Sequence, residues 1–112
     1  TAFPEFEIRG EGVSNGRRWV HFGTESTYLA LNQAHEQIEV KNDYTKSGVN
    51  HLGFVVSDVE AIAERLILAG YKRDYPKQVE EFRIRDYFVD ADGNEYEFVQ
   101  YLSDKPEEMN QY

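Results

Sequence analysis

The segment from Val49 to Tyr101 restricts the possible fold of this chain most, because strand and helix signals follow one another there in a clear order. An apolar run over 49–56 predicts a strand. Ser57-Asp58-Val59-Glu60 then places Ser at the N-cap and Glu at N3, which is a capping box. The helix that follows carries a single apolar stripe and ends before Gly70, the expected C′ residue. The stripe consists of Val59, Ile62, Ala63, Leu66 and Ile67.

Three further strands are predicted after this helix, over Lys72–Tyr75, Glu81–Val89 and Glu95–Tyr101. The last two are joined by the turn Asp90–Asn94, in which Asp92-Gly93 favours a hairpin. A calcium loop is excluded there, because its glycine comes fourth instead of sixth and no glutamate closes a twelve-residue loop. The second half of the chain thus has the order strand, helix, strand, strand, strand.

The first third of the chain predicts a three-stranded antiparallel meander without a helix. Phe6–Arg9 alternates apolar and charged residues, and Gly10–Gly12 loosens the strand. Asn15-Gly16 is a strong type I′ hairpin signal before a strand over Arg17–Phe22, and a third strand covers Thr27–Asn32. Residues 34–48 are polar and predict a connector, with a short strand at Ile38–Val40, and residues 103–112 predict a lightly ordered tail.

Composition excludes several classes of function. The net charge of −9 disfavours nucleic acid as a partner, since it repels phosphate backbones. The absence of cysteine excludes thiolate nucleophiles and cysteine-based metal sites, and fits a cytoplasmic protein. No apolar run approaches the roughly 20 residues that span a bilayer, so no membrane association is expected.

An internal repeat links the two halves. A shift of 68 residues carries Arg17, Trp19 and Tyr28 onto Arg85, Tyr87 and Tyr96. The same shift carries Leu29 onto Glu97 and places the counterpart of His51 before Thr1. The first strand and helix of the first half are therefore expected to lie outside this chain.

Two motifs resemble the vicinal oxygen chelate superfamily, which is also called the glyoxalase/bleomycin resistance/extradiol dioxygenase superfamily. Asn50-His51-Leu52-Gly53-Phe54-Val55-Val56-Ser57-Asp58-Val59-Glu60 is similar to the opening of its βαβββ module, and Asp90-Ala91-Asp92-Gly93-Asn94-Glu95-Tyr96-Glu97-Phe98-Val99 to its closing hairpin. The resemblance implies an α+β fold, with paired βαβββ modules forming a cupped mixed sheet and the first module lacking its N-terminal strand and helix. It implies a single domain over 1–112, with a partial first module at 1–33, a connector at 34–48, a second module at 49–102 and a tail at 103–112.

By this resemblance, His51 and Glu97 match the two metal-ligand positions of the second module. Strand alternation allows both side chains to face the same side of the sheet. A divalent metal bound there and an ordinary hydrogen-bonded His–Glu pair without a cofactor both remain open. Leu29 cannot bind a metal, and His21 is a further candidate ligand. His35 is expected to be solvated.

Arginine, histidine and aromatic residues of the predicted strands could line a pocket for an aromatic or anionic small molecule, and the predicted set is Trp19, His21, Arg85, Tyr87 and Tyr101. Arginines that alternate along a strand also suit a solvated face, so that alternative stays open. No Ser-His-Asp set, P-loop or dinucleotide motif is present, and no residue stands out as a general base.

The resemblance implies a glyoxalase-like protein that binds a small molecule on its concave sheet, with a metal-dependent lyase, isomerase or dioxygenase reaction as one possibility. The alternative is a metal-free, drug-binding homodimer of the bleomycin-resistance kind. A structural domain without a ligand is a third reading. Metal analysis separates the first two.

Overall fold

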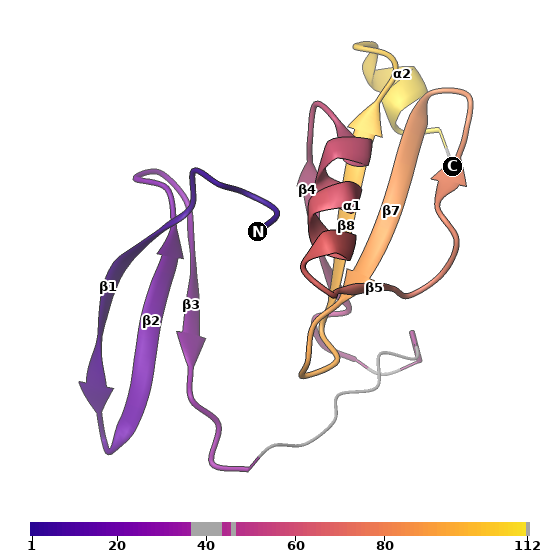
Figure 1. Ribbon diagram of the computed structural model, residues 1–112. Helices are drawn as coiled ribbons and strands as arrows, with labels where there is room; N and C mark the ends of the chain where they lie inside the picture. Colours follow the sequence, from indigo (N-terminus) through magenta and orange to yellow (C-terminus); the bar gives the residue numbers. More distant parts are fainter. Residues whose placement is uncertain (37–43, 46, 112) are drawn as a thin grey trace. The chain divides into compact units, whose positions relative to one another are not determined.

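The computed structural model describes residues 1–36, 44–45 and 47–111 (Figure 1). Contacts within the chain divide it into two compact units, one ending at Ile38 and the other beginning at Glu39. The first unit holds a three-stranded sheet and the second holds a five-stranded sheet with two helices. The predicted α+β class is confirmed.

The sheet of the first unit is the predicted meander. It consists of β1 (Glu7–Ser14), β2 (Arg17–Gly23) and β3 (Tyr28–Asn32), in the order β1-β2-β3 and antiparallel throughout. Asn15 and Gly16 have φ values of 51° and 73° between β1 and β2, as the predicted type I′ turn requires.

Strand β1 is longer than predicted, because Gly10 and Gly12 continue it to Ser14 instead of loosening it. The indole of Trp19 on β2 packs over both glycines. A Cβ at Gly12 would lie 3.1 Å from indole atoms, so a side chain at this position would require the ring to move by a few tenths of an ångström. A bulge between Ile8 and Gly10 leaves Arg9 unmatched in the β1–β2 ladder.

The ladders assign the side chains of the first sheet to two faces. We call one the Trp19 face and the other the Val20 face. The Trp19 face carries Trp19, His21, Tyr28, Ala30 and Asn32, and the Val20 face carries Ile8, Val13, Val20, Phe22, Leu29 and Leu31. On the Val20 face, Ile8, Val13 and Leu31 are exposed over 60%, 69% and 48% of their surface.

The second unit begins with a strand and a helix. Its elements are β4 (His51–Val55), α1 (Val59–Leu68), β5 (Lys72–Arg73), β6 (Gln78–Val79), β7 (Arg83–Val89), β8 (Glu95–Tyr101) and α2 (Pro106–Met109). The sheet order is β4-β8-β7-β5, and β6 also pairs with β7. Strand β4 runs parallel to β8, and the other pairs are antiparallel.

Helix α1 covers one face of this sheet, as Figure 1 shows. Four residues of the predicted stripe are buried, Val59, Ile62, Ala63 and Leu66, and form a core with Phe88 and Phe98. Burying each large aliphatic side chain of this set contributes about 1.5–3 kcal/mol. Gly70 follows the helix with φ of 92°, which confirms it as the C′ residue.

The predicted capping box is wrong by one residue. Asp58, not Ser57, is the N-cap, and its carboxylate accepts a hydrogen bond of 3.0 Å from the Ala61 amide. Both residue types favour this position, so composition alone does not distinguish them.

Boundaries elsewhere also differ from the prediction, and the apolar run over 49–56 forms a strand only over His51–Val55. The strand expected over Lys72–Tyr75 ends at Arg73, and the strand expected from Glu81 begins at Arg83 after the separate strand β6. The expected tail contains α2, which has a proline in its first turn and is tied to β7 by a 3.3 Å hydrogen bond from Arg83 to the Met109 carbonyl. The strand expected at Ile38–Val40 lies outside the described residues.

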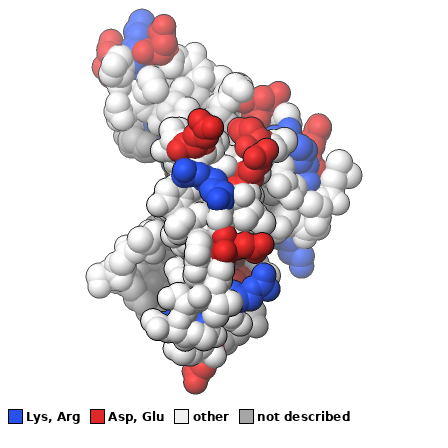
Figure 2. Space-filling model, turned by 90° about the vertical axis from the view of Figure 1, so that its left-hand side faces the viewer, with Lys and Arg blue, Asp and Glu red and all other residues white. Residues whose placement is uncertain are grey.

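Charged side chains of both signs lie in mixed groups on the face drawn in Figure 2. Among the described residues, no helix has the length and apolarity needed to cross a membrane.

Candidate functional site

The structure brings His51 and Glu97 together on the sheet face opposite α1. His51 is the first residue of β4 and Glu97 lies in the middle of the neighbouring β8. His51 Nε2 lies 3.1 Å from Glu97 Oε2. Gly53 pairs with Glu97 across the ladder, and a Cβ there would lie 3.3 Å from Oε2. The missing side chain leaves this side of the carboxylate open.

The other ring nitrogen of His51 faces two oxygen atoms. His51 Nδ1 lies 2.7 Å from Asn50 Oδ1 and 3.6 Å from Glu95 Oε1. Glu95 is only 1% exposed and pairs directly with His51 in the β4–β8 ladder. The imidazole is therefore held between an amide and two carboxylates.

Glu95 is buried as a carboxylate because hydroxyl groups donate to it. The Tyr75 hydroxyl lies 2.8 Å from Glu95 Oε2, and the Tyr44 hydroxyl donates to Oε1. Burial alone would raise the pKa of Glu95, but hydrogen bonds from Tyr44, Asp74 and Tyr75 hold it below its usual value. The hydrogen bond to Glu95 is also the main reason why the pKa of Asp74 is raised.

Glu97 is oriented by Tyr87, which lies directly opposite it on β7. The Tyr87 hydroxyl donates a 2.8 Å hydrogen bond to Glu97 Oε1, which leaves Oε2 directed at His51. Burial and this hydrogen bond raise the pKa of Tyr87, so the phenol stays protonated at neutral pH. Arg85 lies 3.3 Å from the Tyr87 hydroxyl and 2.6 Å from Glu80 Oε1. These contacts form one connected polar network that runs through Glu80, Arg85, Tyr87, Glu97 and His51.

The donor atoms of His51 and Glu97 suit a divalent ion. Imidazole nitrogen and carboxylate oxygen both bind such ions, and Gly53 leaves Oε2 open. Two donor atoms that each lie about 2.1 Å from one ion, at an angle of roughly 95° to each other, are close to the 3.1 Å that separates His51 Nε2 from Glu97 Oε2. Within 1–36, 44–45 and 47–111, no group of three or more His, Cys, Asp or Glu side chains is placed to hold a metal.

The predicted pocket residues fall into two sets. Arg85 and Tyr87 belong to the His51 network, and Tyr101 lies on the same face of β8 as Glu97. Trp19 and His21 lie in the first unit, where they form an aromatic row with Tyr28. The ring centroids are 4.9 Å apart between Trp19 and His21, and 4.6 Å apart between His21 and Tyr28.

The repeat placed Leu29 at the position that corresponds to Glu97, and the ladder corrects this. Glu97 lies opposite Tyr87, ten residues after it. The residue opposite Trp19 is Asn32, thirteen residues after it. These two offsets differ by three residues, and side chains an odd number of residues apart point to opposite faces of a strand. An overlay of the two halves without a gap therefore sets Glu97 against Leu29, which lies on the face opposite Trp19. Asn32 is the ladder equivalent of Glu97, whereas Leu29 lies on the Val20 face.

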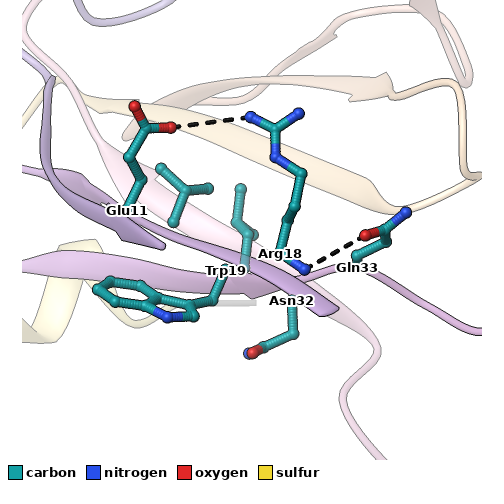
Figure 3. Close-up of a pocket in the computed structure, with 7 residues that line it drawn as sticks. Glu11, Arg18, Trp19, Asn32 and Gln33 are labelled. Atoms are coloured by element: carbon teal, nitrogen blue, oxygen red, sulfur yellow. Dashed lines mark hydrogen bonds and ion pairs between the residues drawn. The ribbon is translucent and has the colours of Figure 1, made fainter. Parts of the chain in front are cut away.

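A separate hollow of about 360 Å³ lies on the first sheet, and Figure 3 draws its lining. Glu11 and Arg18 stand on one side of the strands, where they form an exposed ion pair of 3.8 Å, and Trp19 and Asn32 stand on the other. An exposed pair of this kind contributes at most about 1 kcal/mol. Of the predicted site residues, only Trp19 lines this hollow.

Sequence reasoning missed part of the His51 network: Tyr44, Asn50, Asp74, Tyr75, Glu80 and Glu95. Glu95 could have been found, because it lies two residues before Glu97 and therefore shares its face of the strand. Asn50 was visible next to His51, but only the structure shows its side chain turned back onto the ring. Asp74 and Tyr75 follow a two-residue strand, and no periodicity marks them.

No protein-family model matches the chain. Its structure is similar to a glyoxylase/bleomycin resistance protein/dioxygenase domain from Frankia sp. EAN1pec, with a TM-score of 0.69 and 22% identity over 86% of this chain and 78% of the other. It is also similar to glyoxalase I from Leishmania major, with a TM-score of 0.64 and 20% identity over 85% of this chain and 68% of the other.

A third similar structure is TnmS3, an antibiotic-binding protein from Streptomyces sp. CB03234. The TM-score is 0.58 and the identity 20%, over 86% of this chain and 75% of the other. These likenesses confirm the fold that the two sequence motifs implied. At such identities they establish the fold alone, so the chemistry has to be argued from the residues themselves.

Proposed function

Because the chain has the vicinal oxygen chelate fold, we propose that it binds a small molecule on the sheet face that carries His51, Glu97 and Tyr87. A divalent ion held partly by His51 and Glu97 belongs to this proposal. The observation that carries it is the 3.1 Å approach of His51 Nε2 to Glu97 Oε2 beside the open position at Gly53.

The metal would act as a Lewis acid that polarises neighbouring oxygen atoms of the bound molecule. Neighbouring residues of the protein orient the ligand side chains. Tyr87 fixes the carboxylate of Glu97 by donating to Oε1, and Arg85 adds positive charge beside the Tyr87 hydroxyl. The metal-dependent reaction classes that the resemblance implies are those of lyases, isomerases and dioxygenases.

A metal-free, drug-binding homodimer is the second candidate function. The observation that favours it is the aromatic row of Trp19, His21 and Tyr28, since aromatic faces bind planar ligands by stacking. The Arg9 guanidinium lies 4.7 Å from the centroid of the Tyr28 ring at the end of this row. TnmS3, with the same fold, is described as an antibiotic-binding protein.

Metal binding to the purified chain separates the two functions. We expect calorimetric titration with Mn²⁺, Ni²⁺ and Zn²⁺ to show one site, and elemental analysis to show the ion retained. His51→Ala and Glu97→Ala each remove a ligand and should abolish stoichiometric binding. His35→Ala removes an exposed histidine outside the network and should bind like the unmodified protein.

Failure to bind any of these ions at millimolar concentration would defeat the metal-dependent proposal. Fluorescence then tests the second function, because Trp19 is the only tryptophan. Quenching of Trp19 by planar aromatic compounds, lost in Tyr28→Ala, would support binding on the aromatic row.

A further inference from the structure

One glutamate holds two neighbouring arginines of β7. Glu80 directly follows β6, and its backbone N–H donates a 2.9 Å hydrogen bond to the Arg83 carbonyl. Its carboxylate forms an ion pair with Arg83 through Oε2, and Oε1 lies 2.6 Å from Arg85 Nη2. Arg83 and Arg85 are two residues apart and therefore lie on the same face of the strand. A single carboxylate thus balances two guanidinium groups that repel each other.

Arg85 also lies close to the carboxylate of the candidate site. It pairs with Val99 across the β7–β8 ladder, and Glu97 comes two residues before Val99 on the same face of β8. Such diagonal neighbours are within reach of long side chains. Arg85 Nη1 lies 3.3 Å from the Tyr87 hydroxyl oxygen, which donates to Glu97 Oε1 over 2.8 Å. A single hydroxyl group therefore separates the guanidinium from Glu97.

Arg85 has two carboxylates within its range, and only a pair with Glu80 leaves the site open. Its side chain is only 16% exposed, so a guanidinium without a carboxylate partner would be costly there. Burial lowers the pKa of Arg85, but the hydrogen bond to Glu80 and the charges of Glu80 and Glu97 raise it. A bidentate pair between Arg85 and Glu97 would occupy the oxygens that His51 and Tyr87 now contact. It would also cancel the negative charge that attracts a cation.

We propose that Glu80 is a positioning residue, which holds Arg85 away from Glu97 and so keeps the Glu97 carboxylate available to His51 and to a bound cation. Tyr87 completes this arrangement, because its hydroxyl accepts from Arg85 and donates to Glu97. The consequence for metal binding rests on the proposed function. The position of the Arg85 side chain, however, is a property of the metal-free protein.

The metal-free protein tests the position of Arg85 directly. Glu80→Gln keeps the size of the side chain and removes its charge, so Arg85 loses this carboxylate. We expect a crystal structure of the variant to show the Arg85 guanidinium on Glu97, with N–O distances of about 2.8 Å. Glu81→Gln removes the same charge from the neighbouring, exposed residue and should leave Arg85 on Glu80. An Arg85 side chain that stays beside the Tyr87 hydroxyl or turns into solvent in Glu80→Gln would overturn the proposal.

Calorimetric titration with Zn²⁺ or Ni²⁺ tests the consequence for metal binding. We expect Glu80→Gln to weaken binding about 10–100-fold, because Arg85 then competes for Glu97. Glu81→Gln should bind like the unmodified protein. Arg85→Met keeps an unbranched side chain without the charge, and adding it to Glu80→Gln should restore the affinity to that of Arg85→Met alone. Such a rescue distinguishes a role exerted through Arg85 from a general loss of structure. An equal weakening by Glu80→Gln with and without Arg85→Met would overturn the proposal.

If Glu80→Gln alone does not fold, the two variants that carry Arg85→Met still decide the matter. Both lack the competing guanidinium, so they must bind the ion with equal affinity, and weaker binding by the double variant would overturn the proposal. A protein that binds no ion would defeat the proposed metal-dependent function, and a displaced Arg85 in Glu80→Gln would leave this inference standing. Metal binding by Glu80→Gln at undiminished affinity would do the reverse.

Discussion

Two glycines of β1 determine how closely the indole of Trp19 approaches the backbone of that strand. Trp19 packs its indole over β1, and a side chain at Gly12 would press against the ring in this position. At Gly10, by contrast, a Cβ would lie 3.7 Å from the indole, which is an ordinary van der Waals contact. The two glycines therefore have different roles, although both lie under the same ring.

A pair of substitutions tests this difference. We expect Gly12→Ala to displace the indole, to shift the Trp19 emission maximum and to lower the unfolding free energy by about 1 kcal/mol or more. Gly10→Ala should leave the emission unchanged, and its effect on stability should be neutral or favourable by about 0.4–1 kcal/mol through the unfolded chain. Fluorescence and urea denaturation measure both. Equal responses at the two positions would contradict the packing described here.

At the scale of elements, helix α1 depends on a cap that sequence reasoning placed one residue too early. We predict that Asp58→Ala lowers the unfolding free energy by about 1 kcal/mol, because the Ala61 amide loses its partner. Ser57→Ala should change it by only a few tenths. Parallel urea denaturation curves measure both variants. A larger loss for Ser57→Ala would restore the capping box that the sequence favoured.

Elements with local signals could be predicted, and elements formed by distant pairing could not. The Asn15-Gly16 hairpin, the stripe of α1 and the strand Glu95–Tyr101 carry their signals within a few residues. The two-residue strands β5 and β6 exist because each pairs with β7, which follows them in the chain. Nothing in their own sequence marks their ends.

Buried charges are a second reason why sequence reasoning fell short. Asp86 is 0% exposed within β7, and its carboxylate is held by Arg73 at 2.8 Å. In the candidate site, the resemblance pointed to His51 and Glu97, and strand alternation allowed the two side chains to share a face. The hydroxyl donors that keep Glu95 charged come from Tyr44 and Tyr75, 51 and 20 residues earlier in the chain, where no pattern connects them.

At the scale of the whole molecule, the exposed apolar side chains of the Val20 face bear on association. Apolar patches that remain exposed are frequently covered by a partner. We predict that this chain forms a homodimer, with a mass twice its own 13.1 kDa. Sedimentation velocity over a hundredfold range of concentration measures this. A single species of monomer mass throughout the range would contradict the prediction.

The fold as a whole could be predicted from the sequence because two motifs, one before α1 in the chain and one after it, occur in the right order. The identity of a ligand could not be predicted, because specificity for a ligand depends on side chains that these motifs do not contain. Asn50 lies at the edge of one motif, and Asp74, Tyr75 and Glu80 lie between them.

The difference in offset between the two hairpins shows what sets the sides of a strand. Strand β3 meets β2 through the pairs Gly23–Tyr28 to Trp19–Asn32. The distance along the chain from Trp19 to its partner exceeds that from Tyr87 to its partner by three residues, yet Asn32 and Glu97 lie at equivalent places in their ladders. The apolar face of β3, with Leu29 and Leu31, fixes the register of the strand, and the connection before it adjusts in length. An alignment of the two halves therefore needs a gap of three residues between Tyr87 and Glu97, and this gap sets Asn32 against Glu97.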